Sequence, residues 1–550
     1  MDNIHLNSDE FGKRFIDLYQ VLRNRVEFIG KNRNAISKLH KKSVIKRAIK
    51  QGASYLPFDY QDAYVNPLKN NLDLVIAQAG GLMPDLVGAL FDHVYPHDDP
   101  NPYHSKNLSN QLKQFLAVLS NFYRSFCNLQ VHRAFKFEVE EPWLPPLATF
   151  RARSTLNVPT PYYFPADEAK LLFGGKVGVV VLPSTYREHP LLWGALAHEM
   201  AHDLLRADRR FLPDVQKLVM ELFAKDKTIV EKYFRKDKKV LDNTKKFLGQ
   251  LWRHWIGEAG ADILAICNMG PAFALLAAVY TAALNKELVP SILEELQEAL
   301  AYAEFFEEFA LKANLEKRIA NLQERSKEMD NVPILRASPP DRGSMEEIDT
   351  HPPDILRLFT MIGAIEALEE EEELSDEVNA KQYIKWIKEV EKIGNTDKNG
   401  KLRDDKVTIK GFLQIGTDSW ITVEEDQYDL PLEMMKESAR QVGRLMVSEH
   451  LQRLKPYLQS MVVWNNEDEA VAIRVKKILC TKHEEMDSIT NEGANDAQLL
   501  AGVTLAAFDY PDLYTNVNKR LAEALQRSFE RDEVWGNSTT ALAREWSPSS

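Results

Sequence analysis

Cysteine is scarce in this chain, and the features of an exported protein are missing. The three cysteines, Cys127, Cys267 and Cys480, are spread widely over 550 residues. That spacing fits neither a disulfide framework nor a thiolate zinc site, so it favours a reducing compartment such as the cytoplasm. The N-terminal sequence MDNIHLNSDEFGKRF has no apolar stretch after a basic start. We therefore expect no secretory signal.

A long uninterrupted apolar run is missing as well. Residues 263–284 come nearest, with enough length to span a bilayer. Gly270 and Pro271 interrupt this run, and Glu258 and Asp262 lie directly before it. A break there leaves two halves that are each too short to cross a membrane. We therefore expect two buried helices that meet at a bend, and no membrane insertion.

Positive charge is also in short supply. Lys and Arg number 69 against 81 Asp and Glu, which gives a net charge of −12. Because phosphate attraction needs a cationic surface, general nucleic-acid binding is not expected. A basic stretch at 31–50 could contact an acidic partner, but a solvated helix face is the simpler explanation. With only 24 Gly and 26 Pro, the chain is not dominated by linkers, and most of it should fold.

The chain shows mainly helical periodicity, which predicts a mostly helical α+β fold with a small sheet. KVGVVVLP at 176–183 predicts a strand, and two short strands are expected at 406–413 and 419–425. Helices are expected around these strands, including one over 248–266 and, after a loop at 330–354, two over 355–374 and 379–393. Because 550 residues exceed one ordinary core, we divide the chain into an N-terminal helical region (1–150), a core (151–365), a C-terminal helical region with a strand pair (366–535) and a disordered tail (536–550).

The strongest chemical signal is the HExxH pattern in LLWGALAHEMAHDLL. On a helix, His198 and His202 lie one turn apart on one face, where both imidazoles can reach one zinc ion. Glu199 then lies beside the metal, where its carboxylate can take the proton of an attacking water. The alternative is a pair of core histidines with a salt-bridged glutamate. Burying three ionisable side chains among small apolar residues needs a reason, and this favours the metal.

A catalytic zinc needs a third protein ligand, and WRHWIGEAGADILAI offers one. Glu258 is the candidate ligand. Asp262 lies one turn further on, where it can accept a hydrogen bond from a ligating imidazole and fix its tautomer. His254 lies on the same stripe of this predicted helix and is a rival third ligand. A glutamate with an aspartate behind it fits a catalytic site better.

These segments resemble the gluzincin metallopeptidases, in which HExxH is followed by a Glu-x-x-x-Asp helix. EAGAD at 258–262 is similar to the form found in the family of CAAX prenyl proteases and bacterial heat-shock membrane proteases. That family carries His-Pro-Pro-x-x-x-Arg downstream, and residues 351–357 read HPPDILR. The resemblance covers about residues 176–365 and implies a gluzincin-like core with Zn²⁺. Membrane-embedded members have transmembrane helices that this chain lacks, so their substrates are not carried over.

Further roles complete the expected site. His351, held by two prolines before a helix at about Asp354, is a candidate hydrogen-bond donor to the oxyanion of the transition state. Arg357, one turn into that helix, would orient substrate or pair with an acid near the site. The alternative for both residues is a simple helix-start turn with a surface cation. The resemblance also implies that the strand before the active-site helix pairs with an extended substrate, which assigns substrate binding to Gly178, Val179, Val180, Val181 and Leu182.

The predicted function is therefore a zinc-dependent endopeptidase with Glu199 and His351 as catalytic groups and a protein or peptide substrate. Two other classes stay open. One is a scaffold protein whose metal site is structural or spent, and the other is a zinc hydrolase that acts on a non-peptide amide. The size of the regions flanking the core suggests that they restrict access to the site or respond to a regulatory protein partner.

Overall fold

A computed structural model of the chain places part of the sequence well enough to describe. It describes residues 13–19, parts of 111–122, 143–150, 162–164, 176–182, 189–207, 211–226, 228–234, 238–285, single positions within 297–323, 333–339, 347–370, 380–397, 399–414, 420–453, 463–480 and 494–531. The basic stretch at 31–50, Cys127 and the tail from 536 lie outside the described residues.

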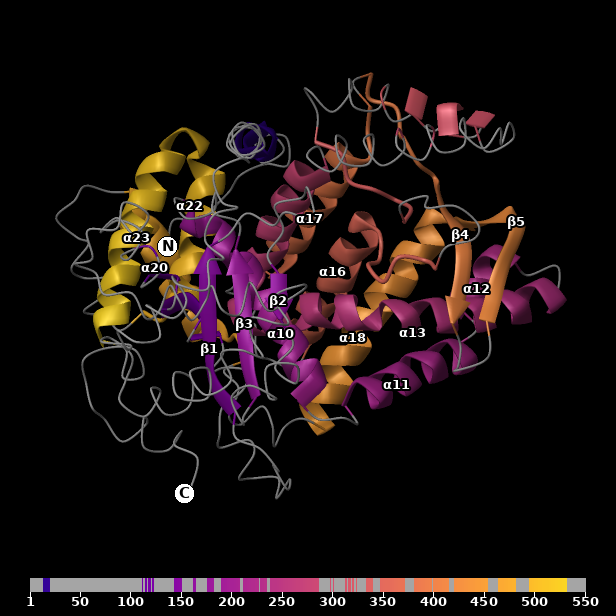
Figure 1. Cartoon of the computed structure of the whole chain (residues 1–550), viewed down its shortest axis with the longest axis horizontal. Helices are drawn as coiled ribbons and strands as arrows, with labels where there is room; N and C mark the ends of the chain where they lie inside the picture. Colours follow the sequence, from indigo (N-terminus) through magenta and orange to yellow (C-terminus); the bar gives the residue numbers. More distant parts are fainter. Residues whose placement is uncertain are drawn as a thin grey trace, which may run out of the picture.

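The described chain is mostly helical and carries two small sheets, which confirms the predicted α+β class (Figure 1). In the first sheet, β3 (Lys176–Leu182) lies between β1 (Trp143–Phe150) and β2 (Tyr162–Phe164). It runs parallel to β1 and antiparallel to β2. The second sheet is the antiparallel pair of β4 (Lys406–Gln414) and β5 (Trp420–Pro431), where the sequence predicts two strands.

Two helices after the first sheet, α10 and α13, carry the residues that the sequence predicts to hold a metal. The 3-10 helix η4 (Pro190–Ala195) leads directly into α10 (Leu196–Ala207). The long helix α13 (Lys238–Met269) follows and packs along α10 and along α11 (Phe211–Lys225) (Figure 1). Apolar residues at three- and four-residue spacing give α13 its buried face, as a helical stripe requires: Leu248, Leu251, Trp252, Trp255, Ile256 and Ala259.

The apolar run 263–284 is bent, as predicted. α13 ends at Met269, and a second helix runs over residues 272–285. Gly270, between them, has a φ of 75°, in the left-handed region that favours glycine. Trp464 covers this bend, and its backbone N–H donates to the carbonyl of Cys267 at 2.7 Å. Among the described helices, none is long and apolar enough to cross a membrane.

Further along the chain, α16 (Asp354–Glu370) begins at an ion pair between Asp354 and Arg336. The carboxylate of Asp354 accepts hydrogen bonds from the backbone and guanidinium of Arg336 and from the side-chain amide of Asn285. These contacts fix where α16 begins. The helix is then covered by α17 (Ala380–Gly394) and α18 (Leu432–Arg453).

The C-terminal helices form a second layer beside the first sheet (Figure 1). They are α20 (Asn466–Cys480), α22 (Asp496–Asp509) and α23 (Tyr514–Arg531), the last after the short 3-10 helix η7 (Pro511–Leu513). The helical residues 13–19 dock on α22: Phe15 stacks on Phe508, and the Arg14 guanidinium donates to the carbonyl of Asp509 at 2.8 Å. The first and last described helices therefore share one core.

The boundaries drawn from composition do not coincide with breaks in the packing. The buried apolar residues form one cluster that runs from Phe15 to Leu525. The boundary after residue 150 separates β1 from β3, to which it is paired, and the boundary after residue 365 falls inside α16. Proline-rich and charged stretches mark local changes in the chain, but the packing of distant segments decides where a core ends.

The bend after α13 makes a stability prediction with a matched control. At Gly270, a Cβ atom would lie 2.4 Å from the indole of Trp464, whereas at Gly400, with a φ of 77°, nothing lies within 4 Å. Gly400→Ala should therefore lower the free energy of unfolding by about 1 kcal/mol through backbone strain alone. Gly270→Ala should lose a further 1–3 kcal/mol, approximately, from the clash. Urea unfolding followed by tryptophan fluorescence compares them, and equal losses would contradict this packing.

Candidate metal centre

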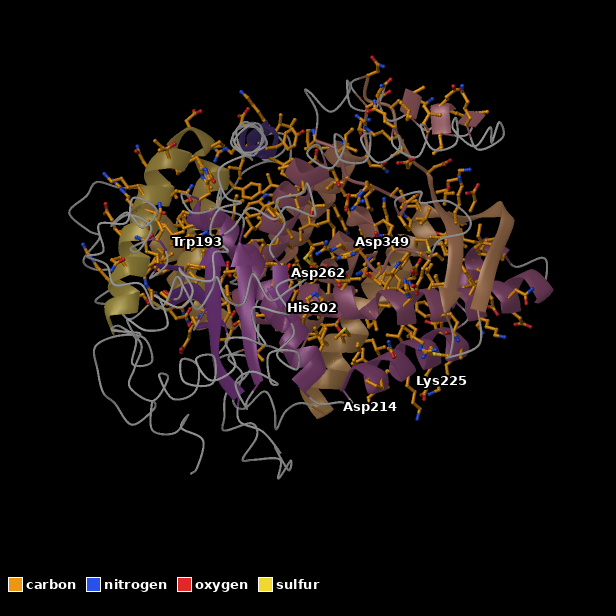
Figure 2. The ribbon with its side chains drawn as sticks, viewed as in Figure 1. Trp193, His202, Asp214, Lys225, Asp262 and Asp349 are labelled. Atoms are coloured by element: carbon orange, nitrogen blue, oxygen red, sulfur yellow. The ribbon has the colours of Figure 1, made fainter. Side chains whose placement is uncertain are left out.

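The two histidines of the HExxH pattern lie on one face of α10, as a spacing of four residues requires. The other face of the helix is anchored in the core by Leu196, Ala197, Met200 and Ala201, all 0% exposed. The side chains of His198 and His202 are only 10% and 12% exposed. In Figure 2, His202 lies near the middle of the view, and Asp214 and Lys225 of α11 lie near its lower edge. The helix therefore offers two nearly buried imidazoles to one point.

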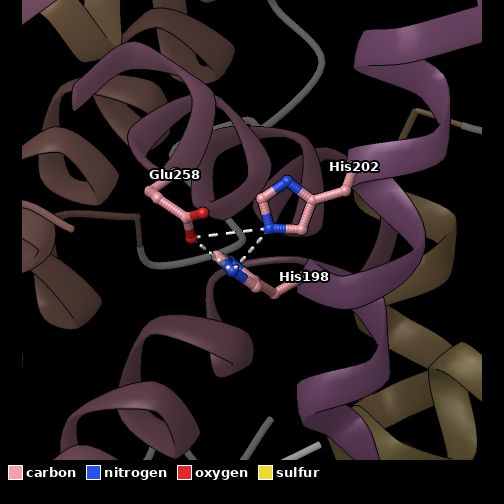
Figure 3. A group of neighbouring side chains, drawn as sticks. All are labelled: His198, His202 and Glu258. Carbon is pink, nitrogen blue, oxygen red and sulfur yellow. Dashed lines mark hydrogen bonds and ion pairs between the residues drawn. The ribbon is translucent and has the colours of Figure 1, made fainter. Parts of the chain in front are cut away.

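Glu258 of α13 meets these imidazoles from the facing helix (Figure 3). The Nε2 atoms of His198 and His202 lie 3.2 Å apart. Oε2 of Glu258 lies 3.3 Å from the first nitrogen and 3.4 Å from the second. The three candidate ligand atoms thus form a nearly equilateral triangle.

That triangle fits the size of a tetrahedral zinc site. Zn–N and Zn–O bonds of about 2.0–2.1 Å at tetrahedral angles separate neighbouring ligand atoms by about 3.3–3.4 Å. In addition, Oε2 of Glu258 is buried and has no hydrogen-bond partner among the described residues. A buried carboxylate oxygen that makes only ion-pair contacts of 3.3–3.4 Å and no hydrogen bond is costly, and a cation at this point would offset that cost. The donor set of two imidazoles and a carboxylate suits a divalent metal such as zinc.

Asp262, one turn after Glu258, holds the first imidazole from behind. Its fully buried carboxylate lies 2.8 Å from Nδ1 of His198 and accepts two hydrogen bonds from Arg357, at 2.7 and 2.8 Å. Because a carboxylate only accepts, Nδ1 of His198 carries a proton, and Nε2 faces Glu258. Arg357 thus pairs with an acid of the site rather than with solvent.

These contacts shift the pKa values of the metal-free site. Burial opposes protonation of His198, but the charge and hydrogen bond of Asp262 outweigh it and raise the pKa to about 10. Burial alone would raise the pKa of Asp262, but Arg357 above all lowers it to about 2. Burial would also raise the pKa of Glu258, yet contacts with His198 and His202 hold it well below its usual range. Without a metal, the ionised carboxylates of Glu258 and Asp262 are therefore paired with a protonated His198.

Glu199 differs from the other acids of the site, because its pKa is raised. Burial of the carboxyl is the main cause, and the nearby charges of His198 and His202 only partly offset it. Glu199 is thus within electrostatic range of both imidazoles without being one of the three side chains that converge.

His351 and His254 occupy different places around Glu258. The Nε2 atom of His351 lies 3.4 Å from Oε2 of Glu258, and its side chain is 53% exposed, so it stands at the open side of the site. The Nδ1 atom of His351 lies 2.8 Å from Asp349. The ring of His254 is directed to the backbone carbonyl of Ile348, at 2.7 Å, and does not belong to the converging group.

The strand assigned to substrate binding needs correction. Residues 178–182 belong to β3, and Val179, Val180 and Val181 are paired with β1 on one side and with β2 on the other. Since its hydrogen-bonding edges are taken, this strand offers no edge to a peptide. Among the described strands, β2 lies at the outside of the sheet and contacts α10. The sequence misled because β1 and β2 lie in proline- and aromatic-rich stretches whose pairing no local pattern shows.

Sequence reasoning missed Asp349, which is labelled in Figure 2 and contacts the ring of His351. Its carboxylate accepts the backbone N–H of His351 at 2.9 Å as well as contacting the ring. The signal was local: an aspartate two residues before a histidine commonly bonds the backbone N–H at that position. The role of His254, by contrast, depends on a residue 94 positions away.

Comparison with known proteins identifies no family. No protein-family model matches the chain, and no curated protein and no solved structure matches it significantly. The resemblance to gluzincins therefore remains a resemblance of short motifs. Function has to be inferred from the side chains that meet at this centre.

The geometry predicts which residues are needed for metal. Wild-type protein incubated with zinc and desalted should retain about one ion per chain, because three converging protein ligands are enough to hold a catalytic zinc. Glu258→Ala removes a corner of the triangle and should retain far less, whereas His254→Ala, the matched control on the same helix, should retain the wild-type amount. Elemental analysis measures both. Loss of zinc from the His254 variant alone would mean that the ligand is misassigned.

The raised pKa of His198 predicts proton release on metal binding. In the metal-free protein the pKa is about 10, above the ordinary 6.5, so the pair with Asp262 stabilises the fold fully below pH 6.5 and loses that contribution as pH rises through 10. A metal requires the neutral ring, so binding at about pH 7.5 should release about one proton. Calorimetry in buffers of different ionisation enthalpy counts it. Asp262→Asn should reduce the number, and no release by the wild type would refute the shift.

Proposed function

We propose that the chain is a zinc-dependent peptidase of the gluzincin type, in which His198, His202 and Glu258 would hold the ion. The observation that carries the proposal is the triangle of three candidate ligand atoms, 3.2, 3.3 and 3.4 Å apart. Glu199, which is not one of the converging side chains, follows His198 on the same helix. Zinc at this point supplies a Lewis acid that polarises a carbonyl and lowers the pKa of a water molecule to about 7. Two imidazoles and one glutamate are the ligand set of catalytic zinc in several peptidases.

Glu199 is the proposed general base. It follows the ligand His198 on α10, and it is not one of the converging ligands. Its raised pKa brings the carboxyl closer to the range in which it can both accept a proton from water and return one to the leaving amine. A carboxyl at its ordinary pKa would accept the proton less readily. Burial of Glu199 thus raises its pKa in the direction that suits both proton uptake from water and proton return to the amine.

His351 is the proposed donor to the oxyanion. Its Nε2 atom faces Glu258 at the exposed side of the site, opposite the buried contacts of Asp262 with His198 and Arg357. A substrate carbonyl that enters from that side would pass His351 before it reaches the ligands. For this role Nε2 must carry a proton in addition to the Nδ1 proton that the Asp349 carboxylate accepts.

We place an extended peptide substrate beside β2 instead of β3. An extended peptide that adds to the outer edge of β2 would lie alongside α10, which β2 contacts. The peptide backbone would then run beside the helix that carries Glu199. The three widely spaced cysteines still favour a reducing compartment such as the cytoplasm, where a regulatory protein partner that controls access would serve an enzyme of this kind.

One observation favours a second candidate function, a structural metal site. The Nε2 atom of His351 lies 3.4 Å from Oε2 of Glu258, near enough to suggest a fourth ligand that would close the site. A scaffold protein would need such closure and would not need Glu199. The exposure of His351, 53%, and the tuned carboxyl of Glu199 favour the open, catalytic form.

The role of Glu199 is tested by a near-isosteric change. Glu199→Gln should retain zinc at the wild-type level, because no ligand is removed, and should abolish hydrolysis of fluorescein-labelled casein, because the amide cannot accept a proton. Zinc content and casein hydrolysis are measured on the same preparation, with Glu221→Gln on the exposed face of α11 as the control. Hydrolysis by the Glu199 variant at the wild-type rate would exclude the mechanism.

A further inference from the structure

The segment before α16 is tied to the middle of α13 by two neighbouring side chains. The ring Nε2 of His254 lies 2.7 Å from the carbonyl oxygen of Ile348. The indole N–H of Trp255 donates to the carbonyl of Asp349 at 3.0 Å. Since Glu258 follows His254 by one helical turn, the residues that hold the segment and the candidate metal ligand lie close together on one helix.

Within the segment, Asp349 links the anchored backbone to His351 by two contacts. Its carboxylate accepts the backbone N–H of His351 at 2.9 Å and lies 2.8 Å from ring Nδ1. The ring is thereby turned so that Nε2 lies 3.4 Å from Glu258. Thr350 contributes little, since its hydroxyl is 3.5 Å from Nδ1, at the limit of a hydrogen bond.

His351 needs such support because little else in its surroundings fixes the ring. Its side chain is 53% exposed, so core packing does not select one rotamer. Pro352 and Pro353 follow it and have no N–H group to donate. The carbonyls of residues 348 and 349 and the amide of His351 are therefore the backbone groups by which the described contacts hold the segment.

We propose that His254, Trp255 and Asp349 form a latch that positions His351 over the metal centre. The three are positioning residues: Asp349 contacts His351 directly, His254 and Trp255 hold the backbone carbonyls of residues 348 and 349, and none of the three belongs to the converging group. The latch explains why a histidine with ligand-like spacing stands on α13 without joining the metal. Its catalytic purpose rests on the proposed function, since an oxyanion donor that is displaced by about 1 Å loses much of its effect.

The physical latch is tested without any enzyme assay. Trp255→Phe keeps an aromatic ring, although a smaller one, and loses the N–H donor, so amide hydrogen exchange in a peptide covering 348–353 should speed up about fivefold. Trp252→Phe is the matched control, because Trp252 packs on Trp255 but donates to Ser438 at 2.9 Å, away from the segment. Equal exchange in wild type and the Trp255 variant, or equal acceleration by both variants, would overturn the latch. If Trp255→Phe does not fold, His254→Phe replaces it under the same criterion.

The consequence for turnover separates positioning from mere structure. Asp349→Ala should lower kcat for casein hydrolysis about 10–100-fold, with KM and zinc content unchanged. Asp349→Asn, whose side-chain oxygen can still accept the proton of Nδ1, should recover part of the loss. In a His351→Ala background, Asp349→Ala should cost nothing further, because it acts only through that ring. Independent, additive losses would contradict the assignment.

The two proposals fail in different ways. If the wild-type chain retains no zinc and hydrolyses no casein, the proposed function is wrong, while the exchange measurement still decides the latch. If the chain is an active peptidase and exchange at 348–353 ignores Trp255, the latch is wrong and the ligands and Glu199 are unaffected.

Discussion

The carboxylate of Asp262 is the group on which the rest of the centre depends. It is 0% exposed, and it receives two hydrogen bonds from Arg357 while it holds Nδ1 of His198. A buried carboxylate is expensive unless it is paired, so α16, which supplies Arg357, must dock on α13 for the site to form. That docking decides which nitrogen of His198 points at the ligand triangle. The fold and the chemistry thus share one interaction.

The helix α13 organises the centre because successive turns of it contact the core, the candidate metal site and the segment before α16. Its apolar stripe packs in the core, while Glu258 and Asp262 face α10 and α16. The turn before them holds the 348–349 backbone through His254 and Trp255. Where the helix ends, the bend at Gly270 is covered by Trp464. One rigid element therefore sets the positions of a candidate metal ligand, its supporting acid and the loop that carries His351, which is how precise sites are built.

Much of this could be predicted from the sequence where the physics is local. The four-residue spacing of His198 and His202 determines that they share a helix face, and the prolines before Asp354 indicate where α16 begins. What could not be predicted depends on segments far apart. The sequence predicts that Arg357 orients substrate or pairs with an acid near the site, but its choice of Asp262 depends on a contact that spans 95 residues. The enclosure of β3 between two strands has no local pattern. Local signals predicted the side chains that converge, but long-range packing decides their support.

Zinc K-edge X-ray absorption on the zinc-loaded protein tests the central claim most directly. The account predicts two imidazole nitrogens and one carboxylate oxygen from the protein at about 2.0–2.1 Å, with no sulfur and with the remaining position taken by solvent. In His351→Ala this spectrum should be unchanged, because His351 stands beside the ligands and does not bind. A third imidazole in the wild-type spectrum that disappears in the variant would show a closed, structural site and contradict the account.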